Sequence, residues 1–147
     1  MSRSFGDAPR RVFVDTSAYY ASADPRDVDT AATREILREL VSRQVELITT
    51  NFVVAELHAL LIARGSRDVA RRSLSAFYRS RLTTVIRATE DDEQRALAII
   101  LQYEDKDFSF TDAISFAVME RLGISHAFSL DRHFAQYGWV MLQFERE

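Results

Sequence analysis

Five short runs of β-branched and apolar residues alternate along the chain with longer segments whose apolar residues recur at helical spacing. These runs cover residues 11–14, 45–49, 82–87, 126–130 and 139–144. Short apolar runs predict strands, and strands that alternate with helices form parallel sheets covered on both faces. The sequence therefore predicts an α/β fold of three layers, with a parallel sheet of five strands in the middle.

Residue types that favour helix ends mark the segments between these runs. The expected helices are residues 31–43 after Asp24 and Pro25, residues 51–64 capped by Asn51 and ended by Gly65, residues 67–80 capped by Ser66, residues 93–103 after a capping box of Thr89 and Asp92, and residues 112–122 capped by Thr111 and ended by Gly123. The expected helices and strands together account for most of the chain.

Length and composition favour one domain. A chain of 147 residues that is 47% apolar can bury a core, but it is too short for two domains. Only four glycines and two prolines are present, and no linker or internal repeat divides the sequence. We expect a single domain over residues 1–147, with a core of about residues 11–144 and a flexible extension at residues 1–10.

Charge and cysteine content exclude several classes of protein. The net charge of −3 argues against a uniformly basic coat for nucleic acid, so an RNA partner would have to meet a local patch. The chain has no cysteine, which rules out disulfides, thiolate zinc sites and cysteine nucleophiles and leaves oxygen and histidine chemistry. No apolar run approaches the roughly 20 residues of a membrane span. We therefore expect a cytoplasmic protein without a membrane partner.

Four acidic residues fall where a parallel α/β sheet binds ligands. Asp15 and Asp131 directly follow the first and fourth runs, while Glu56 and Asp112 lie in the early turns of two expected helices. Taken singly, each has an ordinary explanation as a turn or first-turn acid. Together they would converge on the carboxyl edge of the sheet, where like charges raise one another's pKa unless a cation binds.

The four carboxylates offer only hard oxygen ligands, which suit Mg²⁺ or Mn²⁺ better than Zn²⁺. Such an ion engages phosphate oxygens and activates water, so these residues predict metal-assisted hydrolysis of phosphodiester bonds without a covalent protein nucleophile.

Four segments resemble, in order and separation, the successive motifs of PIN-domain nucleases. They are VFVDTSA at residues 12–18, NFVVAEL at 51–57, DFSFTDAISFAVMERLGI at 107–124 and AFSLDRHF at 127–134. The resemblance spans about residues 11–144, and the length is most similar to that of the VapC-type toxin ribonucleases of toxin–antitoxin pairs.

The resemblance implies a strand order of 3-2-1-4-5 and an acidic pocket that binds Mg²⁺ or Mn²⁺ and cleaves single-stranded or loop RNA. It places Asp15, Glu56, Asp112 and Asp131 in the metal site and gives Ser129 the role of orienting the fourth acid or the attacking water. Many relatives carry a further acid where this chain has His133. That histidine could contact phosphate or cap its turn, and we favour the turn.

Arginines dominate the segment of residues 64–87, which has a net charge of +6. Guanidinium groups bind phosphate through a planar set of donors, so this segment could hold the RNA backbone. The candidate RNA-binding residues are Arg64, Arg67, Arg71, Arg72, Arg79 and Arg81. A solvated helix face explains the same pattern equally well.

The predicted function is a Mg²⁺- or Mn²⁺-dependent endoribonuclease, the toxin of a toxin–antitoxin pair, with an antitoxin partner and a homodimeric state implied by the resemblance. The alternatives are a stand-alone PIN-domain nuclease that processes RNA, a non-catalytic RNA-binding domain and a signalling receiver module. Receivers carry a pair of adjacent acids after the first strand and a lysine near the site. This chain has a single acid there, and its one lysine, Lys106, lies in a loop.

Overall fold

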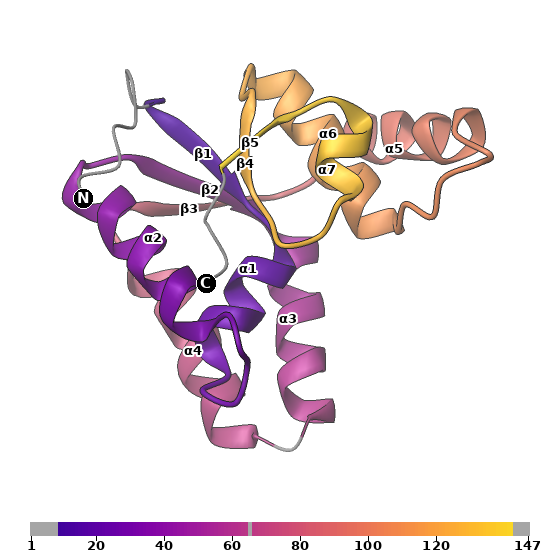
Figure 1. The fold of residues 1–147 in the computed structure, drawn as a ribbon. Coiled ribbons are helices and arrows are strands. Elements are labelled where there is room, and N and C mark those ends of the chain that lie inside the picture. Colours follow the sequence, from indigo (N-terminus) through magenta and orange to yellow (C-terminus); the bar gives the residue numbers. More distant parts are fainter. Residues whose placement is uncertain (1–8, 65, 143–147) are drawn as a thin grey trace.

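The computed structural model describes residues 9–64 and 66–142 and contains one parallel sheet. Its strands are β1 (Arg11–Val14), β2 (Glu46–Thr50), β3 (Thr83–Ile86), β4 (His126–Phe128) and β5 (Val140–Met141). They lie in the order β3-β2-β1-β4-β5, with β1 at the centre (Figure 1). In register, Phe13 of β1 lies opposite Ile48 of β2 and Ala127 of β4. The predicted sheet and its strand order are confirmed.

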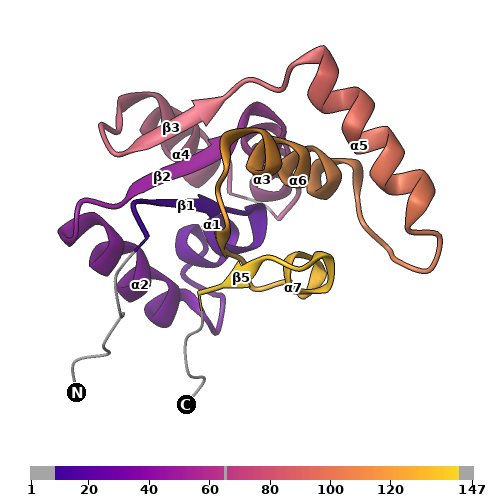
Figure 2. The same ribbon diagram turned by 90° about the horizontal axis from the view of Figure 1, so that it is seen from above.

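Helices connect the strands and cover both faces of the sheet. They are α1 (Thr16–Ala23), α2 (Thr30–Ser42), α3 (Asn51–Ala63), α4 (Arg67–Arg79), α5 (Glu90–Gln102), α6 (Phe110–Leu122) and α7 (His133–Tyr137). Within the described ranges, none is long and apolar enough to cross a membrane. Figure 2 shows α5 and α6 on one side of β1, and α1 and α2 on the other.

The buried side chains of the central strand, β1, explain why helices pack on both faces of the sheet. Val12 and Val14 pack into a cluster with residues of α2, including Leu40. Phe13, between them, packs into a second cluster with Phe116 of α6. Because successive side chains of a strand point to opposite faces, a run of three buried apolar residues requires a helix layer on each side.

Three of the expected strands are shorter than the runs that predicted them; the run at 82–87 forms β3 only over residues 83–86. The run at 126–130 leaves the sheet after Phe128, and of the run at 139–144 the structure places Val140 and Met141 in β5. Residues 143 and 144 of that run, and residues 1–8 of the expected extension, lie outside the described residues.

Capping was predicted correctly for two helices. Ser66 accepts a hydrogen bond from the amide of Val69 at 3.3 Å, and Thr89 and Asp92 form the capping box that starts α5. Gly123 ends α6 in the left-handed conformation, with φ of 68°, as expected. Gly65 lies outside the described residues.

The N-cap residues of three other helices were predicted wrongly. Thr50, not Asn51, caps α3, and the Asn51 side chain accepts a hydrogen bond from the amide of Ala88. Ser109, not Thr111, caps α6 in a capping box with Asp112. The helix expected over residues 31–43 is present as α2, but its N-cap is Asp29; Asp24, the expected cap, is the C-cap of α1.

Candidate active site

The four predicted acids line one open pocket of about 480 Å³ at the carboxyl edge of the sheet. Asp15 follows β1, Glu56 lies in α3, Asp112 lies in the first turn of α6, and Asp131 lies in the turn between β4 and α7. Residues 116 positions apart in the chain therefore meet in one site. Their binding of a metal stays a prediction.

Asp15 is almost completely buried and is held by two hydroxyl groups. Its Oδ2 accepts hydrogen bonds from Ser129 at 2.9 Å and from Ser17 at 3.0 Å. The Ser129 oxygen also accepts from the amide of Asp131 at 3.1 Å, and the Ser17 oxygen accepts from the amide of Leu130 at 2.9 Å. Ser129 therefore touches the carboxylate of the first acid and only the backbone of the fourth, whereas the resemblance implied that it orients the fourth acid or the attacking water.

Burial and neighbouring charge disfavour the ionised form of two of these acids. Burial raises the pKa of Asp15 to about 6; the charges of Asp112 and Asp131 act in the same direction, while the Ser129 hydrogen bond lowers it. Burial is also the largest cause of the raised pKa of Asp112, to which the charge of Asp131 adds. The charge on one acid of this pocket therefore changes how readily Asp15 and Asp112 ionise.

Replacing Ser129 by alanine should destabilise the metal-free protein more at pH 8 than at pH 5. The variant loses a hydrogen bond to the charged form of Asp15, so the pKa of Asp15 rises further and its ionisation above pH 6 becomes more unfavourable. We expect a loss of about 1–2 kcal/mol at pH 8. Urea denaturation with chelator at both pH values measures it, with the exposed Ser75→Ala on α4 as the control. An equal loss at both values would contradict this.

Asp112, Asp131 and His133 form the tightest group of potential metal ligands in the described part of the chain. One ligand atom from each lies within 4.8 Å of the others. His133 Nδ1 is 2.8 Å from Asp112 Oδ2 and 3.2 Å from Asp131 Oδ1. Asp112 is fixed in addition by the amide of Ser109, which donates to its Oδ2 at 3.0 Å.

The role that we favoured for His133, capping its turn, is filled by Asp131, whose Oδ1 accepts from the amide of His133 at 2.6 Å. The ring of His133 lies beside two acids, Asp112 and Asp131, a position that the sequence did not predict. The signal was available, because the family resemblance implied an acid at that position.

Glu56 lines the pocket but lies outside the tight group formed by Asp112, Asp131 and His133. The sequence analysis also missed Asp27 and Asp29, which contribute two more carboxylates to the pocket wall. They lie in the irregular turn before α2, where the sequence resembles an ordinary polar loop. Only the packing of that turn beside the pocket brings Asp27 and Asp29 to its wall.

The structure separates the six candidate RNA-binding arginines. Arg64, at the end of α3, lines the acidic pocket. The other five do not line it; four of them, Arg67, Arg71, Arg72 and Arg79, lie exposed on α4, and Arg81 lies exposed after it. Arg72 forms an ion pair with Asp68 at 3.0 Å.

Comparison with known proteins identifies similar chains. The family model described as PIN domain matches residues 12–140. The 23S rRNA-specific endonuclease VapC20 of Mycobacterium tuberculosis, found in two strains, is 32% identical over 132 residues, covering 88% of this chain and 95% of the relative.

Two solved structures have a similar fold. The crystal structure of Mycobacterium tuberculosis VapC20, described as a Sarcin-Ricin loop cleaving toxin, matches with a TM-score of 0.80 and 29% identity, covering 88% of this chain and 96% of that one. A toxin–antitoxin complex from Klebsiella pneumoniae matches with a TM-score of 0.58 and 14% identity, covering 90% of this chain and 96% of that one.

Proposed function

Because the chain belongs to the PIN domain family, we propose that it is an endoribonuclease that hydrolyses phosphodiester bonds of RNA with the help of Mg²⁺ or Mn²⁺. The family match confirms the resemblance that the four sequence motifs indicated. It also excludes the alternative that the chain is a signalling receiver module. The observation that carries the proposal is the convergence of Asp15, Glu56, Asp112 and Asp131 on one pocket.

The residues present fit a hard divalent cation. The charges of Asp112 and Asp131 raise the pKa of Asp15, and the charge of Asp131 raises that of Asp112, so these three acids lie close together. Carboxylate oxygens with one imidazole nitrogen are a suitable donor set for Mg²⁺ or Mn²⁺. We propose that these three acids hold the cation, with Glu56 lining the same pocket and His133 beside Asp112 and Asp131. When bound, the cation supplies charge stabilisation and an activated water for attack at phosphorus.

The chain itself keeps these ligands in place. Ser17 and Ser129 fix the carboxylate of Asp15 by two hydrogen bonds, and the capping box at the start of α6 fixes Asp112. Nδ1 of His133 forms a hydrogen bond with Asp112 Oδ2 at 2.8 Å and lies 3.2 Å from Asp131 Oδ1. Such fixed ligands reduce the reorganisation needed when substrate binds.

We propose a structured loop of 23S rRNA as the substrate. VapC20 is 23S rRNA-specific and its structure is that of a Sarcin-Ricin loop cleaving toxin, and this chain matches nearly the whole of it. We further propose that the chain acts as a toxin, forms a homodimer and is held inactive in the cytoplasm by an antitoxin protein.

A hairpin with the sarcin–ricin loop sequence should be cut once, within the loop, by the purified protein in Mg²⁺ or Mn²⁺. A hairpin with the same stem and a scrambled loop is the matched substrate control, and denaturing gels with end-labelled RNA locate the cut. The product of a small reading frame upstream should inhibit this cleavage. Failure to cut any RNA with either cation would refute the proposed function, and cutting of both hairpins alike would refute the proposed substrate.

A further inference from the structure

The wall of the acidic pocket contains one arginine, Arg64, and no lysine among the described residues. Six carboxylates line the same pocket, from Asp15, Asp27, Asp29, Glu56, Asp112 and Asp131. Within residues 9–64 and 66–142, none of the recorded ion pairs involves Arg64. Its guanidinium therefore makes no direct ion pair with the described acids of this pocket.

An aromatic face holds this guanidinium instead. Arg64 Cζ lies 5.2 Å from the centre of the Tyr20 ring. Stacking on a ring restrains the planar group while its N–H donors at the edge stay available. A restrained guanidinium with free donors suits a phosphate group, which it can bind through two parallel hydrogen bonds.

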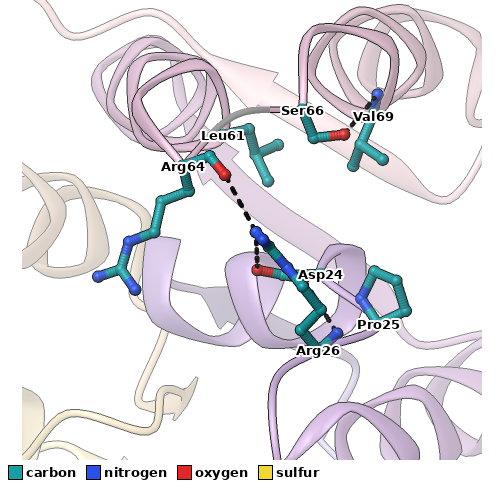
Figure 3. A pocket seen from close by; sticks show the side chains of 7 residues that line it. All are labelled: Asp24, Pro25, Arg26, Leu61, Arg64, Ser66 and Val69. Atoms are coloured by element: carbon teal, nitrogen blue, oxygen red, sulfur yellow. Dashed lines mark hydrogen bonds and ion pairs between the residues drawn. The ribbon is translucent and has the colours of Figure 1, made fainter.

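A clamp formed by Asp24 and Arg26 holds both Arg64 and Tyr20, and Figure 3 shows its contact with Arg64. Arg26 donates to the carbonyl oxygen of Arg64 at 3.0 Å and to both carboxylate oxygens of Asp24 at 3.1 and 3.2 Å. The Tyr20 hydroxyl donates to Asp24 at 2.7 Å. Asp24 therefore links the residue that holds the Arg64 backbone to the ring that holds its side chain.

The side chain of Arg64 does not take part in this clamp. In Figure 3 it extends away from Asp24 and Arg26, and only its carbonyl group faces them. Arg64 also lines the smaller pocket of about 240 Å³ drawn there, so it stands between that pocket and the acidic one. The fold thus holds one cation at the edge of a strongly negative pocket.

We propose that Arg64 binds a backbone phosphate of the RNA next to the bond that is cut, and that Tyr20, Asp24 and Arg26 position it. This inference rests on the proposed function. A chain of phosphates entering a pocket with six carboxylates needs a positive contact beyond the cation, and Arg64 is the candidate arginine that lines that pocket. The other five candidate RNA-binding arginines do not line this pocket.

RNA binding by an uncleaving parent, Asp15→Asn, tests the assignment. Fluorescence anisotropy with the labelled hairpin that the unsubstituted protein cuts gives Kd at several salt concentrations. Adding Arg64→Ala should raise Kd about 5- to 20-fold, in the range of one charge-assisted contact. The slope of log Kd against log salt should fall by about 0.7 to 0.9, the value for one phosphate contact.

Three further variants separate phosphate binding from a structural role. Arg64→Lys should restore the salt slope but only part of the affinity, because it keeps the charge and loses the planar group. Tyr20→Leu should weaken binding with the salt slope unchanged. Arg72→Ala, which removes an exposed arginine of α4, should change Kd less than twofold. In the otherwise unsubstituted protein, Arg64→Ala should raise KM and leave kcat within about threefold.

The inference is wrong if Arg64→Ala keeps the parent's Kd and salt slope, or if Arg72→Ala weakens binding as much. A fall in kcat with Kd unchanged would also overturn it. In each of these cases the unsubstituted protein still cuts RNA, so the proposed function stands. Absence of cleavage by the unsubstituted protein is the separate result that removes the proposed function itself.

Discussion

The Asp15→Asn variant should lose RNA cleavage by more than about a hundredfold and, without metal, unfold at a higher urea concentration than the unsubstituted protein at pH 8. The loss of activity follows because an amide is a poorer ligand than a carboxylate for a hard cation, and Asp15 lies at the most buried point of the acidic pocket. The gain in stability follows because burial and neighbouring charges make the ionised form of Asp15 unfavourable in the folded protein.

The pH dependence of that gain has a definite sign. The pKa of Asp15 is about 6 in the folded protein, against an ordinary value of 3.8 that applies to the unfolded chain. The folded state therefore favours the neutral acid. Below about pH 3 the acid is neutral in both states and the substitution changes little. Between pH 3.8 and about 6 the unfolded chain ionises while the folded protein still holds the neutral acid, so the unsubstituted protein loses stability as pH rises. Above pH 6 this loss is complete, and asparagine avoids it. We expect a difference of about 2–3 kcal/mol above pH 7.

Urea denaturation in chelator between pH 4 and pH 8, together with the hairpin cleavage assay, measures both effects. Asp68→Asn is the matched control, because Asp68 lies exposed on α4, where it pairs with Arg72. It should leave cleavage unchanged and shift stability by less than about 0.5 kcal/mol. An Asp15→Asn protein that cuts at the normal rate would refute the assignment of this ligand. One that is less stable at pH 8 would refute the electrostatic account.

Removal of divalent metal by a chelator should abolish cleavage, and Mg²⁺ or Mn²⁺ should restore it. The physical reason is that Asp15, Asp112 and Asp131 repel one another in the metal-free pocket, and a cation relieves this repulsion. A ligand that binds only the folded state stabilises it by about 2.7 kcal/mol when present at a hundred times its Kd. Thermal unfolding with and without the cation therefore reports binding independently of activity.

The Asp15→Asn protein provides the control for this experiment. It should show a smaller rise in Tm with Mg²⁺ or Mn²⁺, because one ligand and one source of repulsion are missing. Full activity in excess chelator would overturn the metal-assisted mechanism. Equal rises in Tm for both proteins would place the cation outside this pocket.

Helix starts show where local sequence is insufficient. Thr50 and Asn51 are both good caps, as are Ser109 and Thr111, so neighbouring residues compete on nearly equal terms. For α3 the choice is consistent with a distant contact, in which Asn51 accepts a hydrogen bond from Ala88 of the segment after β3. The short helices α1 and α7 were missed altogether, since eight and five residues carry too little periodic signal.

The sequence by itself determined the layered α/β architecture and the places of Asp15, Glu56, Asp112 and Asp131, because strand alternation and the positions of acids at strand and helix ends are local patterns. Tertiary structure alone decided how those acids are held. Ser129 reaches Asp15 across 114 residues of chain, and the ring of His133 meets Asp112 across 21 residues. It also distinguished Arg64 from similar arginines on α4. The residue types were equivalent, and only the packing of the end of α3 beside the turn after α1 placed one guanidinium at the pocket.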